Sequence, residues 1–395
     1  MTPVHVQPGI GSVVVVNSQT VTPFRIEIPD AAVADLRERL RQTRWPDRET
    51  VDDWSQGTPL AYVRELCQYW LEEYDWQAAQ ARLNRFPQFK TVLDDLDIHF
   101  VHVRSPHEAA VPLVMTHGWP GSVTEFWKVI EPLADPVAFG GSAADAFHVV
   151  CPSLPGFGFS GKPTRPGWGT ERIADAWDQL MIRLGYPRYG AQGGDWGSRV
   201  TTALGVRHPE HVVGIHLNMV AAFPAREAAA DLTEREQAAL AAVEYHRAWG
   251  SGYARQQSTR PQSIGYGLVD SPAALCAWIT EKFWAWSDCD GDPANVFSRD
   301  EMLDNIMLYW LPATGASAAR LYWESFASRG TEPVPVPAGC SIFPKEIYRP
   351  SRRWAEPQFP DLRYWNELDK GGHFAALEQP AAFVGEIRAA FRQFR

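Results

Sequence analysis

Short apolar runs alternate with stretches of helical periodicity over most of the chain, and this alternation predicts a mixed α/β fold. Each strand-like run is bounded by turn residues, and most are followed by a helical pattern of ordinary length. This order is typical of right-handed βαβ units and a mainly parallel sheet, in which ligands bind beyond the carboxyl ends of the strands. The expected strands are 90–92, 98–103, 112–116, 147–151, 189–192, 212–217, 337–343 and 363–368.

Two parts of the chain depart from this rhythm. Residues 1–20 predict a loose tail, and residues 23–28 alternate like a strand before a helical stretch. From residue 223 the chain looks helical and rich in tryptophan, with no clear strand. We therefore expect three parts, which are an N-terminal extension packing on the core (1–88), an α/β core (89–222 and 334–395) and a helical lid (223–333).

Two local signals mark expected helix starts. Asp30 is expected to cap a helix with an apolar face. Ser122 followed by Glu125 is a capping-box pattern, which predicts a helix continuing through Leu133.

Composition narrows the class of protein. The chain has 395 residues, of which 45% are hydrophobic, and a formal net charge of −10. A large core is therefore expected, and the acidity disfavours nucleic acids and anionic membranes as partners. The 5 cysteines are widely spaced, and the apolar run 13–16 is too short for a signal sequence or a membrane span. We expect a cytoplasmic protein without a disulfide framework or zinc site.

The sequence Gly-Gly-Asp-Trp-Gly at 193–197 stands between a strand-like run and a helical run. Glycines two residues before and after a protruding side chain, at a tight strand-to-helix turn, are typical of the nucleophile elbow of the α/β-hydrolase fold. The side chain presented here is that of Asp195. A carboxylate is ionised at neutral pH, and its attack on carbon leaves an ester. A surface Gly-Asp turn is the alternative, but His117 and Pro155 also follow expected strands.

In this fold the nucleophile, the acid and the histidine occur in that order along the chain. His373 lies between the last expected strand and the last helix, which is the position of the base. Glu346 follows the preceding strand and is the candidate acid, with Asp361 and Asp369 as alternatives. A serine esterase is excluded, because Ser198 lies too far into the helix to be the nucleophile.

Taken together, the motifs resemble those of microsomal-type epoxide hydrolases in their soluble microbial form. The matching pieces extend over nearly the whole chain, and their order is specific although each is weak alone. Animal members carry a hydrophobic membrane anchor at the N-terminus, and this sequence has none. The pieces are 23–26, 45–47 (Trp-Pro-Asp), 117–122 (His-Gly-Trp-Pro-Gly-Ser), 193–197, 251–253 (Ser-Gly-Tyr), 321–324 (Leu-Tyr-Trp-Glu), 343–346 (Phe-Pro-Lys-Glu) and 371–375 (Gly-Gly-His-Phe-Ala).

The resemblance implies that an epoxide and water become a vicinal diol through an ester on Asp195. Tyr253 and Tyr322 match the lid tyrosines of the family, which bind the epoxide oxygen and protonate it as the ring opens. His373, held by Glu346, then activates the water that cleaves the ester.

The resemblance also implies an oxyanion hole formed by the backbone N–H groups of Trp119 and Trp196. Pro120, cis in relatives, would shape that loop. Neither a metal nor an organic cofactor is required. The expected partner is a small-molecule epoxide, and a homodimer stays open.

Two other functions are weighed against the epoxide hydrolase. A haloalkane dehalogenase also uses an aspartate elbow, but halide departs without an acid, so lid tyrosines are not needed. A catalytically inactive hydrolase serving as a binding protein would tend to lose its base. The tryptophan-rich lid favours aryl or bulky lipophilic epoxides. The family includes members for detoxification, hormone degradation and natural-product tailoring, and the sequence does not choose among them.

Overall fold

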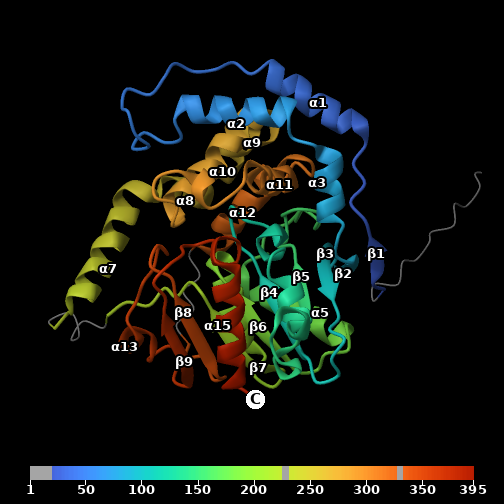
Figure 1. Ribbon diagram of the computed structural model, residues 1–395, viewed down its shortest axis with the longest axis vertical. Coiled ribbons are helices and arrows are strands. Elements are labelled where there is room, and N and C mark those ends of the chain that lie inside the picture. Colours follow the sequence, from blue (N-terminus) through green and yellow to red (C-terminus); the bar gives the residue numbers. More distant parts are fainter. Residues whose placement is uncertain (1–19, 225–230, 327–331) are drawn as a thin grey trace, which may run out of the picture.

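The computed structural model describes residues 20–224, 231–326 and 332–395. The predicted tail lies outside these residues except for Thr20. A sheet forms one half of the molecule, and a layer of helices covers one end of that sheet (Figure 1). In the described parts of the chain, no helix combines the length and apolar character needed to cross a membrane.

Nine strands in the described residues form one sheet, in the order β1-β2-β3-β5-β4-β6-β7-β8-β9. The strands β1, β2, β3 and β5 pair antiparallel, whereas every pair from β5 across to β9 is parallel. The predicted mainly parallel sheet is therefore confirmed. The bounds are β1 (Thr22–Phe24), β2 (Gln88–Leu93), β3 (Leu96–Val103), β4 (Val111–Thr116), β5 (Phe147–Pro152), β6 (Tyr189–Gly193), β7 (Val212–Leu217), β8 (Ala338–Ile342) and β9 (Leu362–Glu367).

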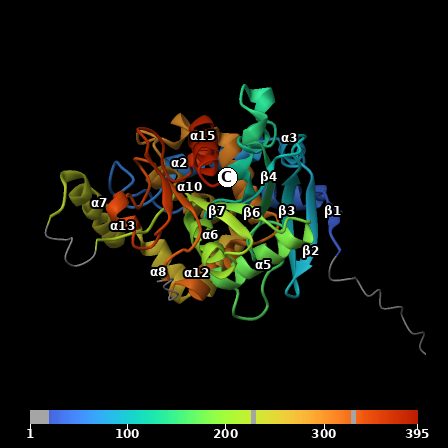
Figure 2. The same cartoon turned by 90° about the horizontal axis from the view of Figure 1, so that it is seen from below.

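Helices cover both faces of the sheet. The helices α5 (Thr170–Arg183) and α6 (Asp195–Arg207) lie on one face, and α15 (Pro380–Arg392) lies on the other (Figure 2). The central strand β6 is buried at every residue, because helices pack on both sides of it. The helix α15 buries an apolar stripe, and Phe394, just beyond the helix end, packs against the same core.

The segment predicted as a lid contains six α-helices in its described residues, and they cover the carboxyl ends of the parallel strands (Figure 1). The N-terminal helices lie against the far side of this group, beside α10 and α11. The bounds are α7 (Glu234–Tyr245), α8 (Gly252–Thr259), α9 (Pro261–Asp270), α10 (Pro272–Trp286), α11 (Arg299–Trp310) and α12 (Gly315–Ser325), and in the N-terminal part α1 (Asp30–Arg41), α2 (Leu60–Glu72) and α3 (Trp76–Leu83).

The N-terminal extension contacts the lid as well as the core. Its strand β1 pairs with β2 at the edge of the sheet. The hydroxyl of Tyr74 donates a hydrogen bond to Asp304 of α11 at 2.7 Å, and the guanidinium of Arg82 donates to the same carboxylate at 2.9 Å and 3.1 Å. The residues of the extension therefore join the edge of the sheet to helix α11.

Three local predictions differ from the structure. The strand expected at 23–28 is limited to Thr22–Phe24, where β2 provides a partner. Asp30 is the first residue of α1, and the cap position is held by Pro29 without a side-chain hydrogen bond. The capping box at Ser122 does not form.

At Ser122 the hydroxyl accepts a hydrogen bond from the Thr124 N–H, and the chain makes the 3₁₀ turn η1 (Val123–Phe126). The side chain of Glu125 lies over Gly121 instead of reaching back to the cap. The expected long helix is reduced to α4 (Ile130–Ala134). Two further short helices, α13 (Arg352–Ala355) and α14 (Ala375–Glu378), lie in the C-terminal part of the core.

Candidate active site

Asp195 occupies a sharp turn between β6 and α6. Its φ of 49° lies in the left-handed region, which side chains other than glycine rarely adopt. The turn requires glycine at 197, because an added β-carbon there would overlap the carbonyl oxygen of Thr116 in β4. The strained backbone therefore presents the Asp195 side chain at the carboxyl end of the central strands.

The two carboxylate oxygens of Asp195 have different surroundings. The Trp119 N–H donates a hydrogen bond to Oδ1 at 2.8 Å, and the backbone N–H of Trp196 also stabilises the charge. The peptide bond between Trp119 and Pro120 is cis. Oδ2 lies 3.6 Å from Nε2 of His373. Burial raises the pKa of Asp195, while His373 and the two backbone N–H groups oppose that rise.

His373 and Glu346 form a buried pair beside Asp195. Glu346 follows β8 and His373 follows β9, so the adjacent parallel strands bring the two loops together. The His373 Nδ1 lies 2.8 Å from Oε1 of Glu346. The alternative acids lie elsewhere, since Asp361 pairs with an arginine two residues along the chain and Asp369 is exposed.

The charges around His373 favour its protonated form. Burial lowers the pKa of the imidazole, but the carboxylates of Glu346, Asp195 and Glu125 outweigh it and raise that pKa to about 9. In the free protein, His373 is therefore an imidazolium between carboxylates at neutral pH.

Two lid tyrosines reach the same point from different helices. Tyr253 in α8 stacks on Trp119 with ring centroids 4.8 Å apart, and Tyr322 in α12 meets Trp196 edge-on at 4.7 Å. Burial raises the pKa of both phenols well above the ordinary value, and the nearby charge of Asp195 adds to the rise. Both are therefore neutral proton donors at neutral pH.

A cavity of about 500 Å³ opens from Asp195 toward the lid. Its volume is within the range of small-molecule sites. Three arginines and several aliphatic side chains lie around it, together with aromatic side chains from the core and the lid. The aromatic residues of the lining are Trp196, Phe223, Tyr253, Tyr322, Phe326 and Tyr348.

The lid tryptophans do not line this cavity in the described residues, which corrects the expected origin of its aromatic character. Trp249 and Trp323 are 79% and 51% exposed. Trp284 stacks on Trp54 of the extension with centroids 5.0 Å apart, and Trp286 packs against His373. The lid tryptophans therefore mainly join elements or face solvent.

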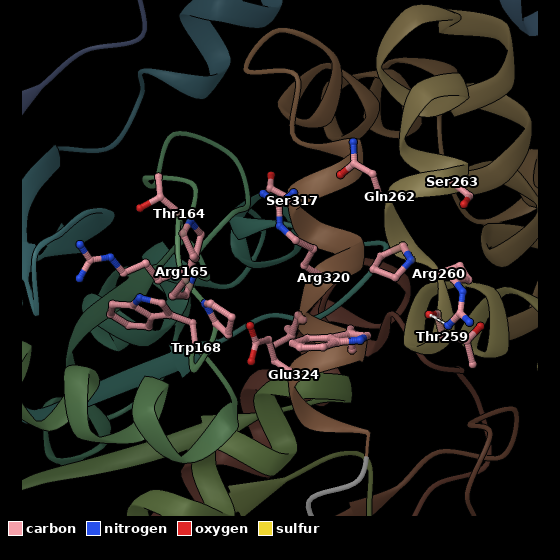
Figure 3. Close-up of a pocket in the computed structure, with 16 residues that line it drawn as sticks. Thr164, Arg165, Trp168, Thr259, Arg260, Gln262, Ser263, Ser317, Arg320 and Glu324 are labelled. Carbon is pink, nitrogen blue, oxygen red and sulfur yellow. Dashed lines mark hydrogen bonds between the residues drawn. The ribbon is translucent and has the colours of Figure 1, made fainter.

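A second cavity, of about 600 Å³, lies on the other side of α12 (Figure 3). Arg320 and Glu324 of α12 face the loop that carries Arg165, and Arg260 approaches from the lid. None of the predicted site residues lines this space within the described chain. We therefore place the candidate active site in the cavity that contains Asp195.

Several residues around Asp195 were not singled out by sequence reasoning. Glu125 and Asn218 line a small space beside Asp195 and His373. Lys282 is 2% exposed, with Nζ 4.5 Å above the ring of Tyr253. The sequence pattern placed Glu125 in a helix cap, so it gave no sign of a role at the site. Asn218 directly follows the strand predicted at 212–217, and its position at the carboxyl end of a parallel strand could have marked it as a candidate.

One group of residues in the described chain could hold a metal, and it lies away from Asp195. Asp178, His208 and His211 bring donor atoms within 4.8 Å of one another, at the amino ends of β6 and β7. His211 and the Tyr189 hydroxyl each lie 2.8 Å from the same carboxylate oxygen of Asp178. These hydrogen bonds between α5 and the residues beside the sheet explain why the three side chains lie together.

The chain matches two family models, described as the epoxide hydrolase N terminus (residues 21–126) and the alpha/beta hydrolase fold (residues 111–264). A protein of Stigmatella aurantiaca, provisionally named an epoxide hydrolase, is 56% identical over 95% of this chain and 86% of its own length. Epoxide hydrolase 1 of Sus scrofa is 35% identical over 94% of this chain and 88% of its own length.

A solved structure gives the same relationship in three dimensions. The epoxide hydrolase of Aspergillus niger is 34% identical and superimposes with a TM-score of 0.86, covering 95% of this chain and 97% of the other. The N-terminal match is specific to epoxide hydrolases, whereas the second match alone would show only the fold. The chain therefore belongs to the microsomal-type epoxide hydrolases, enzymes of the α/β-hydrolase fold that hydrolyse epoxides.

Proposed function

We propose that the protein converts an aryl or bulky lipophilic epoxide and water into a vicinal diol through an ester on Asp195. The observation that carries this proposal is the position of one carboxylate. Asp195 accepts a hydrogen bond from the Trp119 N–H, lies 3.6 Å from the base candidate His373 and faces two buried phenols across a cavity. This arrangement provides a nucleophile, an acid and a base without a cofactor.

In the first step, Oδ2 of Asp195 attacks one epoxide carbon and the bond between that carbon and the ring oxygen breaks. The electron pair of that bond goes to the ring oxygen, which Tyr253 or Tyr322 protonates. Because burial and the Asp195 charge hold the pKa of both tyrosines high, their phenols keep the proton until the alkoxide forms. Oδ1 stays with its backbone donors and becomes the carbonyl oxygen of the ester.

Ester formation itself prepares the second step. The negative charge of Asp195 is one of the causes that raise the pKa of His373 to about 9. The ester is neutral, so its formation removes this contribution and lowers the pKa of the imidazole. The proton that His373 releases returns to the tyrosine that protonated the ring oxygen. The neutral imidazole can then accept a proton from water, with Glu346 holding the ring by Nδ1.

The water oxygen adds to the carbonyl carbon of the ester, and the resulting oxyanion is stabilised by the N–H groups of Trp119 and Trp196. Collapse of this intermediate breaks the bond between the Asp195 carboxyl carbon and Oδ2, which leaves in the product, and the water oxygen takes its place in the carboxyl group. The proton held by His373 passes to this leaving oxygen, which gives the diol, and the Asp195 carboxyl group that remains gives its proton back to His373.

The substrate class is supported by the shape and lining of the cavity. About 500 Å³ surrounded largely by aromatic side chains suits an aryl or branched lipophilic group. A haloalkane dehalogenase is less favoured, because the two phenols next to Asp195 would have no alkoxide to protonate. We also propose that the protein works in the cytoplasm on a small-molecule epoxide.

The test is a product assay with styrene oxide, a small aliphatic epoxide and a haloalkane, run beside Asp195→Ala. We expect diol from wild type, faster turnover of styrene oxide and no diol from the variant. Halide release without diol would instead assign a dehalogenase. Equal turnover of the aliphatic epoxide would contradict the substrate class.

A single turnover in water enriched in oxygen-18 tests the covalent step. If water attacks the ester, the label appears in the Asp195 carboxylate and the first equivalent of diol is unlabelled. Direct attack of water on the epoxide would put the label in the diol, and it would overturn the two-step scheme.

A further inference from the structure

A small cavity lies on the core side of Asp195, separate from the substrate cavity. Its lining includes Asp195 and His373 together with core residues, and it has no contribution from the described lid helices. The space open to the centre of a water-sized sphere is about 10 Å³. This is about the volume that one water molecule needs.

Glu125 places a carboxyl group at this cavity. Glu125 lies in the turn η1. Its side chain lies over Gly121, and its Oε1 occupies the place that a β-carbon on Gly121 would take. Within the described residues, the Glu125 carboxyl makes no hydrogen bond, although Asp195 and His373 are close enough to influence its pKa. Burial, and then the charges of Asp195 and Glu346, raise that pKa to about 8, while His373 opposes the rise.

Asn218 lies at the same cavity, directly after β7. Its amide oxygen accepts a hydrogen bond from Nε2 of Gln192 at 2.8 Å, which fixes the orientation of the amide group. The whole amide group lies against Gly194, next to Asp195. The cavity is therefore bordered by a carboxyl group, an amide and an imidazole, which are enough polar groups to hold one water.

We propose that this cavity holds the water that cleaves the ester, and that Glu125 and Asn218 are positioning residues for that water. One water proton points to Nε2 of His373 and the other to the Glu125 carboxyl. The lone pair used for attack then faces the carbonyl carbon of the ester, and the proton lost in that step goes to His373. Glu125 gains and loses no proton in the step.

The proposal rests on the proposed function, because it assigns a place to the water of the second step. It explains why a carboxyl group that makes no hydrogen bond within the described residues lies beside Asp195 and His373. It also separates the two reagents, since the epoxide enters from the lid side and the water is held on the core side.

The test follows ester formation and ester hydrolysis separately. Enzyme and styrene oxide are mixed, stopped with acid at set times, and the fraction of protein carrying the adduct is measured by mass spectrometry. For Glu125→Leu we expect adduct formation close to the wild-type rate and hydrolysis slower by about 10²-fold, the cost of misplacing a reactant by about 1 Å. The ester should therefore accumulate.

Two further variants keep the test decisive if Glu125→Leu does not fold, as judged by circular dichroism and thermal unfolding. Glu125→Gln keeps the shape of the side chain, and Gly121→Ala moves the carboxylate without changing Glu125. We expect both to slow hydrolysis more than ester formation. Glu131→Gln, an exposed glutamate of the adjoining helix, is the matched control and should leave both steps unchanged.

A pH profile separates positioning from a purely structural role. His373 is surrounded by Glu346, Asp195, Glu125 and Glu378, and His246 is also close enough to feel its charge. Above its own pKa of about 8, Glu125 is charged, and this charge is one of the causes that raise the pKa of His373. Glu125→Gln removes that charge, so the pH at which ester hydrolysis reaches half its maximum should move down. Structural damage alone would lower the rate without moving this midpoint.

Two outcomes would overturn the inference, and they are distinct from failure of the proposed function. If Glu125→Leu and Glu125→Gln form the ester and hydrolyse it at the wild-type rate, this cavity is not the water site. If all steps slow equally with no change in midpoint, Glu125 is structural. If neither wild type nor His373→Gln ever carries an ester on Asp195, the proposed function itself fails.

Discussion

The Nδ1 atom of His373 lies 2.8 Å from Oε1 of Glu346, and this contact joins the loops that follow the last two strands of the sheet. Because the strands β8 and β9 are parallel and adjacent, both loops leave the sheet at the same edge. The hydrogen bond fixes the imidazole with Nε2 toward Asp195. The orientation of the His373 ring is thus set by sheet topology.

Replacing Glu346 with Gln should impair the second step more than the first. The amide keeps the shape but removes the charge that most strongly raises the pKa of His373. A rate of ester hydrolysis reduced by about 10²- to 10⁴-fold is expected, the usual contribution of a positioned base. Rapid-quench mass spectrometry should show the ester accumulating. The exposed Asp369→Asn is the control, and equal loss in both variants would refute the assignment of the acid.

Replacing Tyr253 or Tyr322 with Phe should impair the first step. Each variant removes one proton donor and keeps the stacking of the rings. A decrease of about 10²-fold in ester formation is expected for each single variant, and the double variant should form no ester. Hydrolysis of an ester already formed should be unchanged. Tyr266→Phe, at an exposed position, is the control. Normal ester formation in the double variant would exclude both phenols as the acid.

The charge state of His373 should depend on Asp195. Its pKa is raised to about 9 in the free protein, so the ring stays protonated from neutral pH up to that value. Asp195→Asn imitates the neutral ester and should lower this pKa, because one of the raising charges is removed. Titration of the imidazole by NMR in both proteins measures the shift. An equal or higher pKa in the variant would contradict the proposed release of the base.

Glycine at 197 should be essential for folding. A β-carbon there would overlap the Thr116 carbonyl oxygen, which belongs to a central strand and cannot move away. We expect Gly197→Ala to lower the free energy of unfolding by about 3 kcal/mol or more, as overpacking does at a rigid site. Gly385→Ala in α15 has free space and should raise it by about 0.5–1 kcal/mol. Urea unfolding compares them, and similar stabilities would disprove the steric argument.

The contact between the extension and the lid should contribute measurably to stability. Asp304 accepts hydrogen bonds from Tyr74 and Arg82, and Asp304→Ala would leave the buried Tyr74 hydroxyl without this partner. A loss of about 1–3 kcal/mol is expected. The exposed pair of Asp35 and Arg39 provides the comparison, with about 0.5 kcal/mol or less for Asp35→Ala. Equal effects of the two substitutions on thermal unfolding would count against a structural role for the contact.

Local patterns predicted the sheet well because its strands are buried on both faces and bounded by turns. The strand at 212–217 has the predicted limits, and that at 112–116 starts one residue earlier than predicted. The patterns failed at Asp30 and Ser122. At the first of these helices the cap position is Pro29, without a side-chain hydrogen bond, and at Ser122 the hydroxyl caps only a 3₁₀ turn. The position of the Glu125 side chain depends on tertiary contacts, because its carboxyl group lies over Gly121 and close to Asp195 and does not form the local capping bond.

The sequence by itself determined the family, and it predicted the elbow at Asp195 and the chain order of candidate nucleophile, acid and base, because each depends on residue type and order along the chain. It left Glu346, Asp361 and Asp369 as alternative acids until the resemblance was considered. Only the tertiary structure decided which carboxylate touches His373, which aromatic residues line the cavity, and that Glu125 lies beside the nucleophile. The reason is physical. Distances between loops far apart in the chain, and the burial that shifts their pKa values, arise only when the sheet and lid pack together.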